Sequence, residues 1–335
     1  MSKKDINTNM PFLSIKDLRV EYKSDGQIVH AVNDVSLQLE RGKTLGLVGE
    51  TGAGKTTIAK SILRILPDVG SRIVNGEIHL DGENLLKLPE TEMRKIRGNK
   101  VSMIFQDPMT ALNPVLRVGD QIAEVVRLHS DSNNSAEHEK RAKEMLEIVG
   151  IPAERYYAYP HQFSGGMKQR VVIAIALACN PDLLLADEPT TALDVTIQAQ
   201  VLDLIAELRN KYNTAMLLIT HDMGVVAQVC DNVAVIYAGN IIEYGSKEQI
   251  FRHPSHPYTI GLFGAIPDMN EDEEWLHPIE GLPPDPTDLP QGCSFAPRCK
   301  FVTDACCKES ISMYKTEDGH DCRCCRIAAV KKGED

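Results

Sequence analysis

A glycine-rich loop near the start of the chain constrains the fold more than any other feature. Residues 49–56 read Gly-Glu-Thr-Gly-Ala-Gly-Lys-Thr, which matches the phosphate-loop pattern G-x-x-x-x-G-K-[ST]. The apolar residues 44–48 before it predict a strand, and residues 57–66 after it predict a helix. Glycines in such a loop let backbone N–H groups turn toward phosphate oxygens at the positive end of the helix. The pattern therefore predicts an α/β fold that binds phosphate groups.

Side chains in the loop add specific roles. Lys55 would place a positive charge near the β- and γ-phosphates, and the hydroxyl of Thr56 would bind Mg²⁺. The expected ATP contacts in this region are Gly49, Glu50, Thr51, Gly52, Ala53, Gly54, Lys55, Thr56 and Thr57.

A second segment carries two carboxylates. Residues 183–188 read Leu-Leu-Leu-Ala-Asp-Glu, typical of a buried parallel strand with acids at its C-terminal tip, where ligands bind in open α/β sheets. Asp187 would hold Mg²⁺, directly or through water, and Glu188 would polarise the attacking water. A lone acidic pair is more often a solvated loop. The spacing of 132 residues (187 − 55) from Lys55 favours the catalytic interpretation.

A third segment predicts another phosphate site. Ser164, Gly165 and Gly166 open an apolar helical stretch at 171–179. A serine N-cap followed by glycines makes a helix start that can bind an anion. Alone this is only a helix cap, but the same chain also carries a phosphate loop.

These segments resemble one family. Phe-Ser-Gly-Gly-Met at 163–167 is similar to the Leu-Ser-Gly-Gly-Gln signature of ATP-binding-cassette (ABC) proteins. The resemblance implies that Gln106 is the glutamine that contacts Mg²⁺ and water, and that His221 contacts the γ-phosphate. It also implies that 191–194, Thr-Ala-Leu-Asp, cross a dimer interface and that adenine stacks on Tyr22.

The resemblance also implies a dimer. In this family each ATP lies between the phosphate loop of one domain and the signature of the other. The chain carries one of each, so it must pair with a second domain. Ser164, Gly165, Gly166 and Asp194 would then act in trans. The implied fold is a RecA-like core sheet, an antiparallel β subdomain and a helical subdomain at about 107–180 that faces membrane subunits.

Local patterns agree with this fold. Residues 12–22 and 28–39 alternate apolar and polar side chains, which predicts an antiparallel hairpin. Apolar residues recur with helical spacing at 118–128, 137–149 and 194–208. The net charge of −11 argues against a nucleic-acid partner. Apolar runs are too short to cross a bilayer, and no signal peptide is evident, so a soluble, cytosolic chain is expected.

The C-terminal part has a different character. We expect an ATP-binding domain at 1–265 and a proline-rich linker with a cysteine-rich domain at 266–335. Seven of the nine cysteines lie between Cys293 and Cys325. Disulfides are disfavoured in a reducing cytosol. The spacing leaves an iron–sulfur cluster and structural Zn²⁺ equally favoured, although zinc ligands usually come closer together.

Resemblance to a known family favours the iron–sulfur cluster over structural Zn²⁺. Residues 292–299, Gly-Cys-Ser-Phe-Ala-Pro-Arg-Cys, are similar to the tail of oligopeptide and dipeptide permease ATPases, some of which bind a [4Fe–4S] cluster. The implied ligands are Cys293, Cys299, Cys306 and Cys324. The additional Cys307, Cys322 and Cys325 allow the third and fourth ligands to shift by one or two residues. Because the cluster is expected to be structural and to lie in a separate domain, ATP binding is expected to survive loss of the cluster.

The combined expectation is the D-type ATPase of a peptide importer at the cytoplasmic face of the membrane. Its partners would be an F-type ATPase paralogue, two membrane permeases and an extracellular binding protein. Related importers carry glutathione or metal complexes, and the sequence does not name the substrate. A soluble DNA-repair-type ABC ATPase is less favoured, because only 115 residues (164 − 49) separate Gly49 from Ser164.

Overall fold

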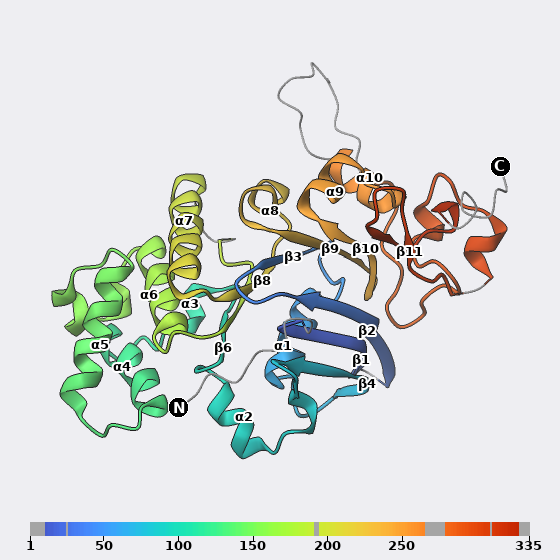
Figure 1. The fold of residues 1–335 in the computed structure, drawn as a ribbon. Coiled ribbons are helices and arrows are strands. Elements are labelled where there is room, and N and C mark those ends of the chain that lie inside the picture. Colours follow the sequence, from blue (N-terminus) through green and yellow to red (C-terminus); the bar gives the residue numbers. More distant parts are fainter. Residues whose placement is uncertain (1–10, 25, 191–193, 265–278, 309, 328–335) are drawn as a thin grey trace. The chain divides into compact units, whose positions relative to one another are not determined.

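The structure, a computed structural model, describes residues 11–24, 26–190, 194–264, 279–308 and 310–327. The chain forms two compact units, each assembled from segments far apart in the sequence. The first comprises residues 1–13, 39–44 and 81–220, and the second comprises 14–38, 45–80 and 221–335. Figure 1 traces their elements in chain order.

The first unit contains three parallel strands in the order β8-β7-β6. These are β6 (Val101–Ile104), β7 (Leu183–Asp187) and β8 (Ala215–Ile219), and every residue in them is buried. Strands of a parallel sheet are covered on both faces, which is why they read as unbroken apolar runs. The strand predicted at 183–187 is confirmed.

Helices make up most of the rest of the first unit. Residues 107–180 contain no strand, as predicted, and α4, α5 and α6 pack on one another within this segment (Figure 1). The elements are β5 (Glu83–Asn84), η1 (Leu85–Lys87), α2 (Glu90–Ile96), α3 (Pro108–Ala111), α4 (Val118–His129), α5 (Ser135–Ile148), η2 (Ala153–Tyr157), η3 (Pro160–Gln162), α6 (Gly165–Leu177) and α7 (Val195–Tyr212).

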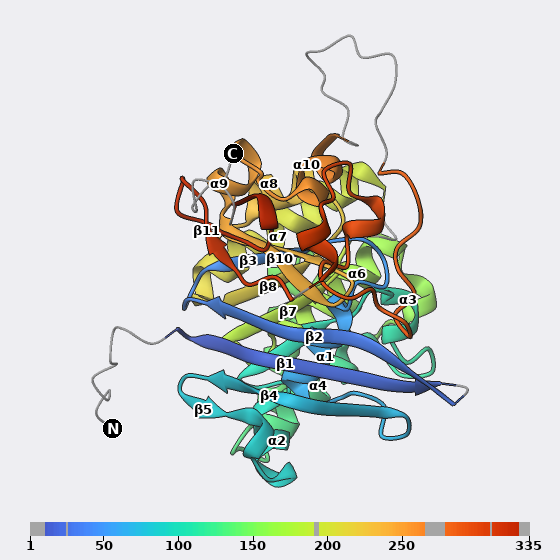
Figure 2. The same ribbon diagram turned by 90° about the vertical axis from the view of Figure 1, so that its right-hand side faces the viewer.

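The second unit begins with three long strands, β1 (Leu13–Ser24), β2 (Gln27–Leu39) and β4 (Ser71–Leu80). They lie side by side in the order β2-β1-β4 (Figure 2). A two-residue connection can only join antiparallel neighbours, so the hairpin predicted from alternating apolar residues is present.

The second unit also contains a mixed sheet in the order β11-β12-β10-β9-β3. Strand β3 (Thr44–Val48) is parallel to β9 (Asn232–Tyr237), and β10 (Asn240–Ser246) is antiparallel to β9. Two short strands of the cysteine-rich tail, β12 (Asp321–Cys322) and β11 (Tyr314–Lys315), extend this sheet beyond β10. The described tail therefore shares a sheet with the strand that precedes the phosphate loop, and a separate cysteine-rich domain is not confirmed.

Helix α1 follows the phosphate loop. It spans Lys55–Leu63, two residues earlier at its start and three earlier at its end than predicted, because Arg64 adopts a left-handed conformation (φ 52°) that ends it. The other helices of this unit are α8 (Met223–Val229), α9 (Lys247–Arg252), α10 (Pro257–Gly264), η4 (Ala296–Arg298) and η5 (Asp304–Cys307). None of the helices within the described ranges has the length and apolar character needed to cross a membrane.

Candidate functional site

The phosphate loop connects β3 to α1 and packs closely against its neighbours. A Cβ atom on Gly49 would overlap the carbonyl oxygen of Ile236, and one on Gly54 would overlap the carbonyl oxygen of Ala31. Gly54 also has a φ of 100°, which side-chain-bearing residues rarely adopt. Both positions therefore require glycine, and the loop backbone can curve tightly before the helix.

Lys55 is the first residue of α1, and its side chain is buried. Its Nζ donates hydrogen bonds to the carbonyl oxygens of Gly49 (2.7 Å) and Glu50 (2.9 Å). The ammonium is thus held across the loop, beside the helix N-terminus where phosphates would bind. The first turn of α1 contacts Tyr22, the residue on which adenine is expected to stack, because the hydroxyls of Tyr22 and Thr57 are hydrogen-bonded at 3.2 Å.

Glu50, in the same loop, contacts the cysteine-rich tail. Arg298 donates through Nη1 to both carboxylate oxygens of Glu50, at 3.1 and 3.0 Å, and to the hydroxyl of Tyr237 at 3.3 Å. The backbone N–H of Glu50 donates to the hydroxyl of Tyr258 at 3.0 Å. These contacts revise the expectation that the tail is structurally separate from the ATP site. Sequence reasoning missed the roles of Arg298 and Tyr258.

An aromatic cluster fixes this part of the tail. Phe295 is buried, and its ring centroid lies 5.3 Å from that of Tyr237 and 5.5 Å from that of Tyr258. The two tyrosine rings are 4.6 Å apart. Edge-to-face and tilted packing of this kind stabilises aromatic groups beyond simple burial. Because η4 starts directly after Phe295, the cluster determines where Arg298 lies.

The first unit brings together two of the predicted catalytic residues. Asp187 is buried at the end of β7, and Glu188 follows it with a left-handed φ of 46°. The Glu188 N–H donates to the carbonyl oxygen of Ile219 at 2.9 Å, and its carboxylate accepts a hydrogen bond from Nε2 of Gln106 at 3.0 Å. The hydrogen bond from Gln106 therefore orients the carboxylate that is expected to polarise water.

The predicted signature begins α6. The hydroxyl of Ser164 caps the helix by accepting the N–H of Met167 at 3.3 Å. Further along α6, Nε2 of Gln169 donates to the carbonyl oxygen of Pro189 at 2.5 Å, a contact that the sequence did not predict. This bond ties the signature helix to the segment after Glu188. A Cβ on Gly166 would crowd the side chain of Ile197 on α7.

The remaining predicted residues lie in loops. Asp194 caps α7 by accepting the N–H of Ile197 at 3.0 Å, whereas 191–193 lie outside the described residues. His221 is exposed, directly before Asp222, which caps α8. The second unit holds Tyr22, Gly49, Glu50, Thr51, Gly52, Ala53, Gly54, Lys55, Thr56, Thr57 and His221, and the first holds Gln106, Ser164, Gly165, Gly166, Asp187, Glu188 and Asp194.

Five tail cysteines line one cavity. They are Cys293, Cys299, Cys306, Cys324 and Cys325. Of the other two tail cysteines, Cys307 is exposed, and Cys322 lies buried in β12 opposite Glu243. Each cysteine in the chain has a free thiol. The four expected ligands therefore share a single cavity, and Cys325 is the additional neighbour.

The lining of this cavity indicates whether these cysteines could bind a metal ion or an iron–sulfur cluster. Burial raises the pKa of Cys293 to about 11, which keeps its thiol protonated at neutral pH. The cavity volume is about 10 Å³, and within the described ranges no three His, Cys, Asp or Glu side chains are arranged to hold a metal ion. The donor set, sulfur only, suits iron–sulfur or zinc ligation. Binding of either group would require the thiols to rearrange.

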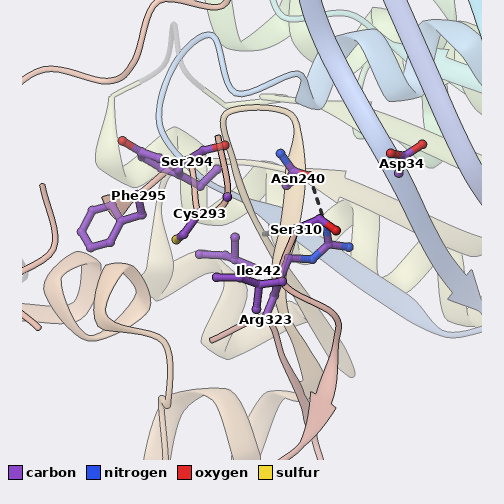
Figure 3. Close-up of a pocket in the computed structure, with 11 residues that line it drawn as sticks. Asp34, Asn240, Ile242, Cys293, Ser294, Phe295, Ser310 and Arg323 are labelled. Atoms are coloured by element: carbon purple, nitrogen blue, oxygen red, sulfur yellow. Dashed lines mark hydrogen bonds between the residues drawn. The ribbon is translucent and has the colours of Figure 1, made fainter. Parts of the chain in front are cut away.

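Cys293 also lines a larger neighbouring cavity of about 120 Å³ (Figure 3). There Arg323, which directly follows Cys322, donates through Nη1 to Oδ1 of Asn240 at 3.2 Å. Asp34 of β2 also lines this cavity. The shared cysteine connects the thiol cluster to a polar cavity bordered by β2 and β10.

Two protein families together match most of the chain. The family described as "ABC transporter" matches residues 32–191. The family described as "Oligopeptide/dipeptide transporter, C-terminal region" matches residues 242–306. The second match covers the segment that carries Cys293, Cys299, Cys306 and Arg298.

Full-length relatives agree. The chain is 50% identical over 298 residues to the oligopeptide transport ATP-binding protein OppD of Haemophilus influenzae, covering 88% of this chain and 91% of that one. It is 48% identical over 314 residues to the dipeptide transport ATP-binding protein DppD of Bacillus subtilis, covering 93% of each. Among solved structures, a dimeric ATP-binding cassette in a post-hydrolysis state with ADP and phosphate has a TM-score of 0.63 at 27% identity. The match covers 70% of this chain and 98% of the chain in that solved structure.

Proposed function

The chain belongs to the ABC transporter family, in its oligopeptide and dipeptide branch. From that premise we propose that it couples ATP hydrolysis to peptide uptake across the cytoplasmic membrane. It is an ATP hydrolase with the P-loop ABC ATPase fold. The observation that carries the proposal is the Gln106–Glu188 pair at the end of a buried strand, in a chain whose Lys55 is held across a phosphate loop.

The proposed catalytic roles combine these contacts with the family resemblance. Lys55 and the N-terminus of α1 bind the β- and γ-phosphates, while Tyr22 stacks on adenine. Thr56, Gln106 and Asp187 would hold Mg²⁺, which would neutralise charge on the phosphates when bound. Glu188 orients and polarises the attacking water, and Gln106 restrains its carboxylate through their hydrogen bond. His221 contacts the γ-phosphate. No covalent phosphoenzyme is required.

Completion of the site requires a second ATPase domain. Ser164, Gly165, Gly166 and Asp194 act on the nucleotide of the partner subunit, with the capped N-terminus of α6 directed at its phosphates. The partner is an F-type paralogue. ATP shifts the population of the pair toward a closed dimer, and hydrolysis returns it to the open state.

The assembled transporter contains further subunits. The names of the relatives describe ATP-binding proteins of oligopeptide and dipeptide transport. On that basis the chain works at the cytoplasmic face with two membrane permeases, and an extracellular binding protein delivers the peptide. The helical segment 107–180 faces the permeases. Membrane vesicles that contain the whole complex should accumulate labelled peptide only with ATP and binding protein, and ATP-independent uptake would refute the coupling.

The cysteine cavity is the proposed site of a [4Fe–4S] cluster, with Zn²⁺ as the alternative. Cys293, Cys299, Cys306 and Cys324 would be the ligands, and the cluster would supply structural cross-linking of the tail. Support comes from the convergence of these four thiols on one cavity.

We also propose a division of the chain into residues 1–265 and 266–335, in which β11 and β12 of the second part join the sheet of the first part.

A further inference from the structure

The phosphate loop carries a negative charge at its second position. The Glu50 side chain is 25% exposed, and its partner Arg298 is 6% exposed. The two come from segments 248 residues apart, yet both carboxylate oxygens of Glu50 lie within 3.1 Å of Nη1 of Arg298. A pair so well shielded from solvent is weakly screened, so each charge strongly affects what binds beside it.

The charge of Glu50 opposes nucleotide binding unless it is neutralised. Nζ of Lys55 lies 2.9 Å from the carbonyl oxygen of Glu50, so this residue is adjacent to the group expected to bind the phosphates. An unpaired carboxylate here would repel a triphosphate and compete for the lysine ammonium. The Arg298 guanidinium neutralises that charge through its contact with both carboxylate oxygens.

Arg298 is itself held from several directions. Its Nε donates to the carbonyl oxygen of Glu280 at 3.0 Å, and its Nη2 donates to that of Ile279 at 3.2 Å. Its backbone N–H donates to the carbonyl oxygen of Phe295 at 3.0 Å. The planar guanidinium therefore has a fixed position set by the tail, independent of Glu50.

We propose that Arg298 is a positioning residue for nucleotide binding: it neutralises Glu50 and fixes the phosphate loop, so the cysteine-rich tail sets the affinity of the chain for ATP. The inference rests on nucleotide binding at the phosphate loop. It adds a regulatory role for the tail, because Arg298 directly precedes Cys299, which lines the thiol cavity. Rearrangement of the thiols would move the guanidinium.

Equilibrium binding of a fluorescent ATP analogue to the full-length chain tests this role at low and high salt. Arg298→Met leaves Glu50 unpaired, and we expect binding about tenfold weaker at low salt, with a smaller deficit at high salt. The double variant Arg298→Met with Glu50→Gln removes both charges, and we expect its affinity to return to within about threefold of the original chain. Glu50→Gln alone keeps the cation, and we expect equal or tighter binding.

The matched control is Lys315→Met, which also removes one cation from the tail. Lys315 pairs with Asp321 at 3.0 Å, and its side chain is 60% exposed. We expect its binding to change by less than about twofold. Arg298→Lys is the second variant, which retains the charge should the methionine variant fail to fold, and its affinity should lie close to that of the original chain.

Three results would overturn the inference. The first is unchanged binding by folded Arg298→Met. The second is a double variant as weak as the single variant, which would mean that Arg298 only anchors the tail. The third is weaker binding by Glu50→Gln alone, which would show that the carboxylate assists the nucleotide. Failure of the unsubstituted chain to bind nucleotide would instead refute the proposed ATP site, so the two failures are distinguishable.

Discussion

Two glutamates of the candidate site have different hydrogen-bond partners. Glu50 contacts the guanidinium of Arg298, whereas Glu188 accepts a hydrogen bond from the neutral amide of Gln106. A cation neutralises a carboxylate, but an amide only orients it. The carboxylate in the phosphate loop is therefore paired with a cation, and the one that follows β7 is oriented by an amide.

Replacement of Glu188 by glutamine tests the catalytic half of this contrast. The amide preserves the shape of the side chain but cannot polarise water, so we expect steady-state hydrolysis to fall at least about 100-fold. ATP should still bind, and the closed dimer should accumulate. Phosphate release by the assembled transporter and size-exclusion chromatography with ATP measure the two effects. Near-normal turnover would remove Glu188 from the catalytic role.

The glycines of the phosphate loop are not equivalent. Gly52 and Gly54 both have positive φ angles, 82° and 100°, but only at Gly54 would a Cβ meet a neighbour, the carbonyl oxygen of Ala31. We expect Gly52→Ala to lower the free energy of unfolding by about 1 kcal/mol through backbone strain alone. Gly54→Ala should cost more, about 2–4 kcal/mol, and weaken nucleotide binding. Urea denaturation measures the difference, and equal costs would contradict the packing argument.

At the scale of elements, sequence patterns predicted the strands better than the ends of helices. Strands β3 and β7 appear as short apolar runs because parallel strands are buried on both faces. The end of α1 was misplaced because it depends on the left-handed conformation of Arg64, which no residue type demands. The helical spacing predicted at 194–208 corresponds to α7, in which Val201, Leu204, Ile205 and Leu208 are all buried.

The same logic explains the site. The positions of residues within a contiguous motif, such as Lys55 at the start of α1 and Glu188 after β7, could be predicted from sequence because each motif folds locally. The contact between Glu50 and Arg298 could not, because it depends on how β9, β10 and the tail are arranged in space. The signals were present, since Arg298 lies in a recognised motif, but spacing alone cannot pair residues 248 positions apart.

The tail is joined to β10 by a buried polar contact as well as by strand pairing. Nε2 of His320 lies 2.9 Å from Oε1 of Glu243, and both side chains are fully buried. Glu243 also accepts the backbone N–H groups of Ser255 (2.6 Å) and His256 (3.1 Å). These bonds hold one end of the cysteine-rich segment, and the thiol cavity is positioned to hold the other.

Substitution of single cysteines tests the proposed cluster. Protein purified without oxygen should be brown, with about four iron and four sulfide per chain. Cys293→Ser should bleach it and increase proteolysis of the tail, because a cavity thiol is lost. Cys179→Ser is the matched control, since this cysteine lies just after α6 in the other unit, and it should do neither. One zinc and no iron per chain would overturn the cluster while leaving the transporter function intact.

At the scale of the whole molecule, the proposed dimer would take half of each composite ATP site from this chain. The chain carries one phosphate loop and one signature, and we propose that they pair with those of a second subunit. Head-to-tail pairing would make catalytic power a property of the complex, because the N-terminus of α6 would reach the nucleotide of the partner. Hydrolysis by the isolated chain would then measure how well two identical copies substitute for the proposed pair.

Reconstitution with the partner subunits tests whether the chain needs a second ATPase domain for hydrolysis. We expect the purified chain alone to be a poor ATPase, and addition of its F-type paralogue and membrane subunits to raise turnover at least about tenfold. Ser164→Arg in this chain should abolish the gain, because a bulky cation replaces the cap that faces the partner's nucleotide. The same substitution should leave ATP binding to the chain's own phosphate loop unchanged. Full activity of an isolated homodimer, insensitive to Ser164→Arg, would show that the site is completed within one chain and would refute the heterodimer.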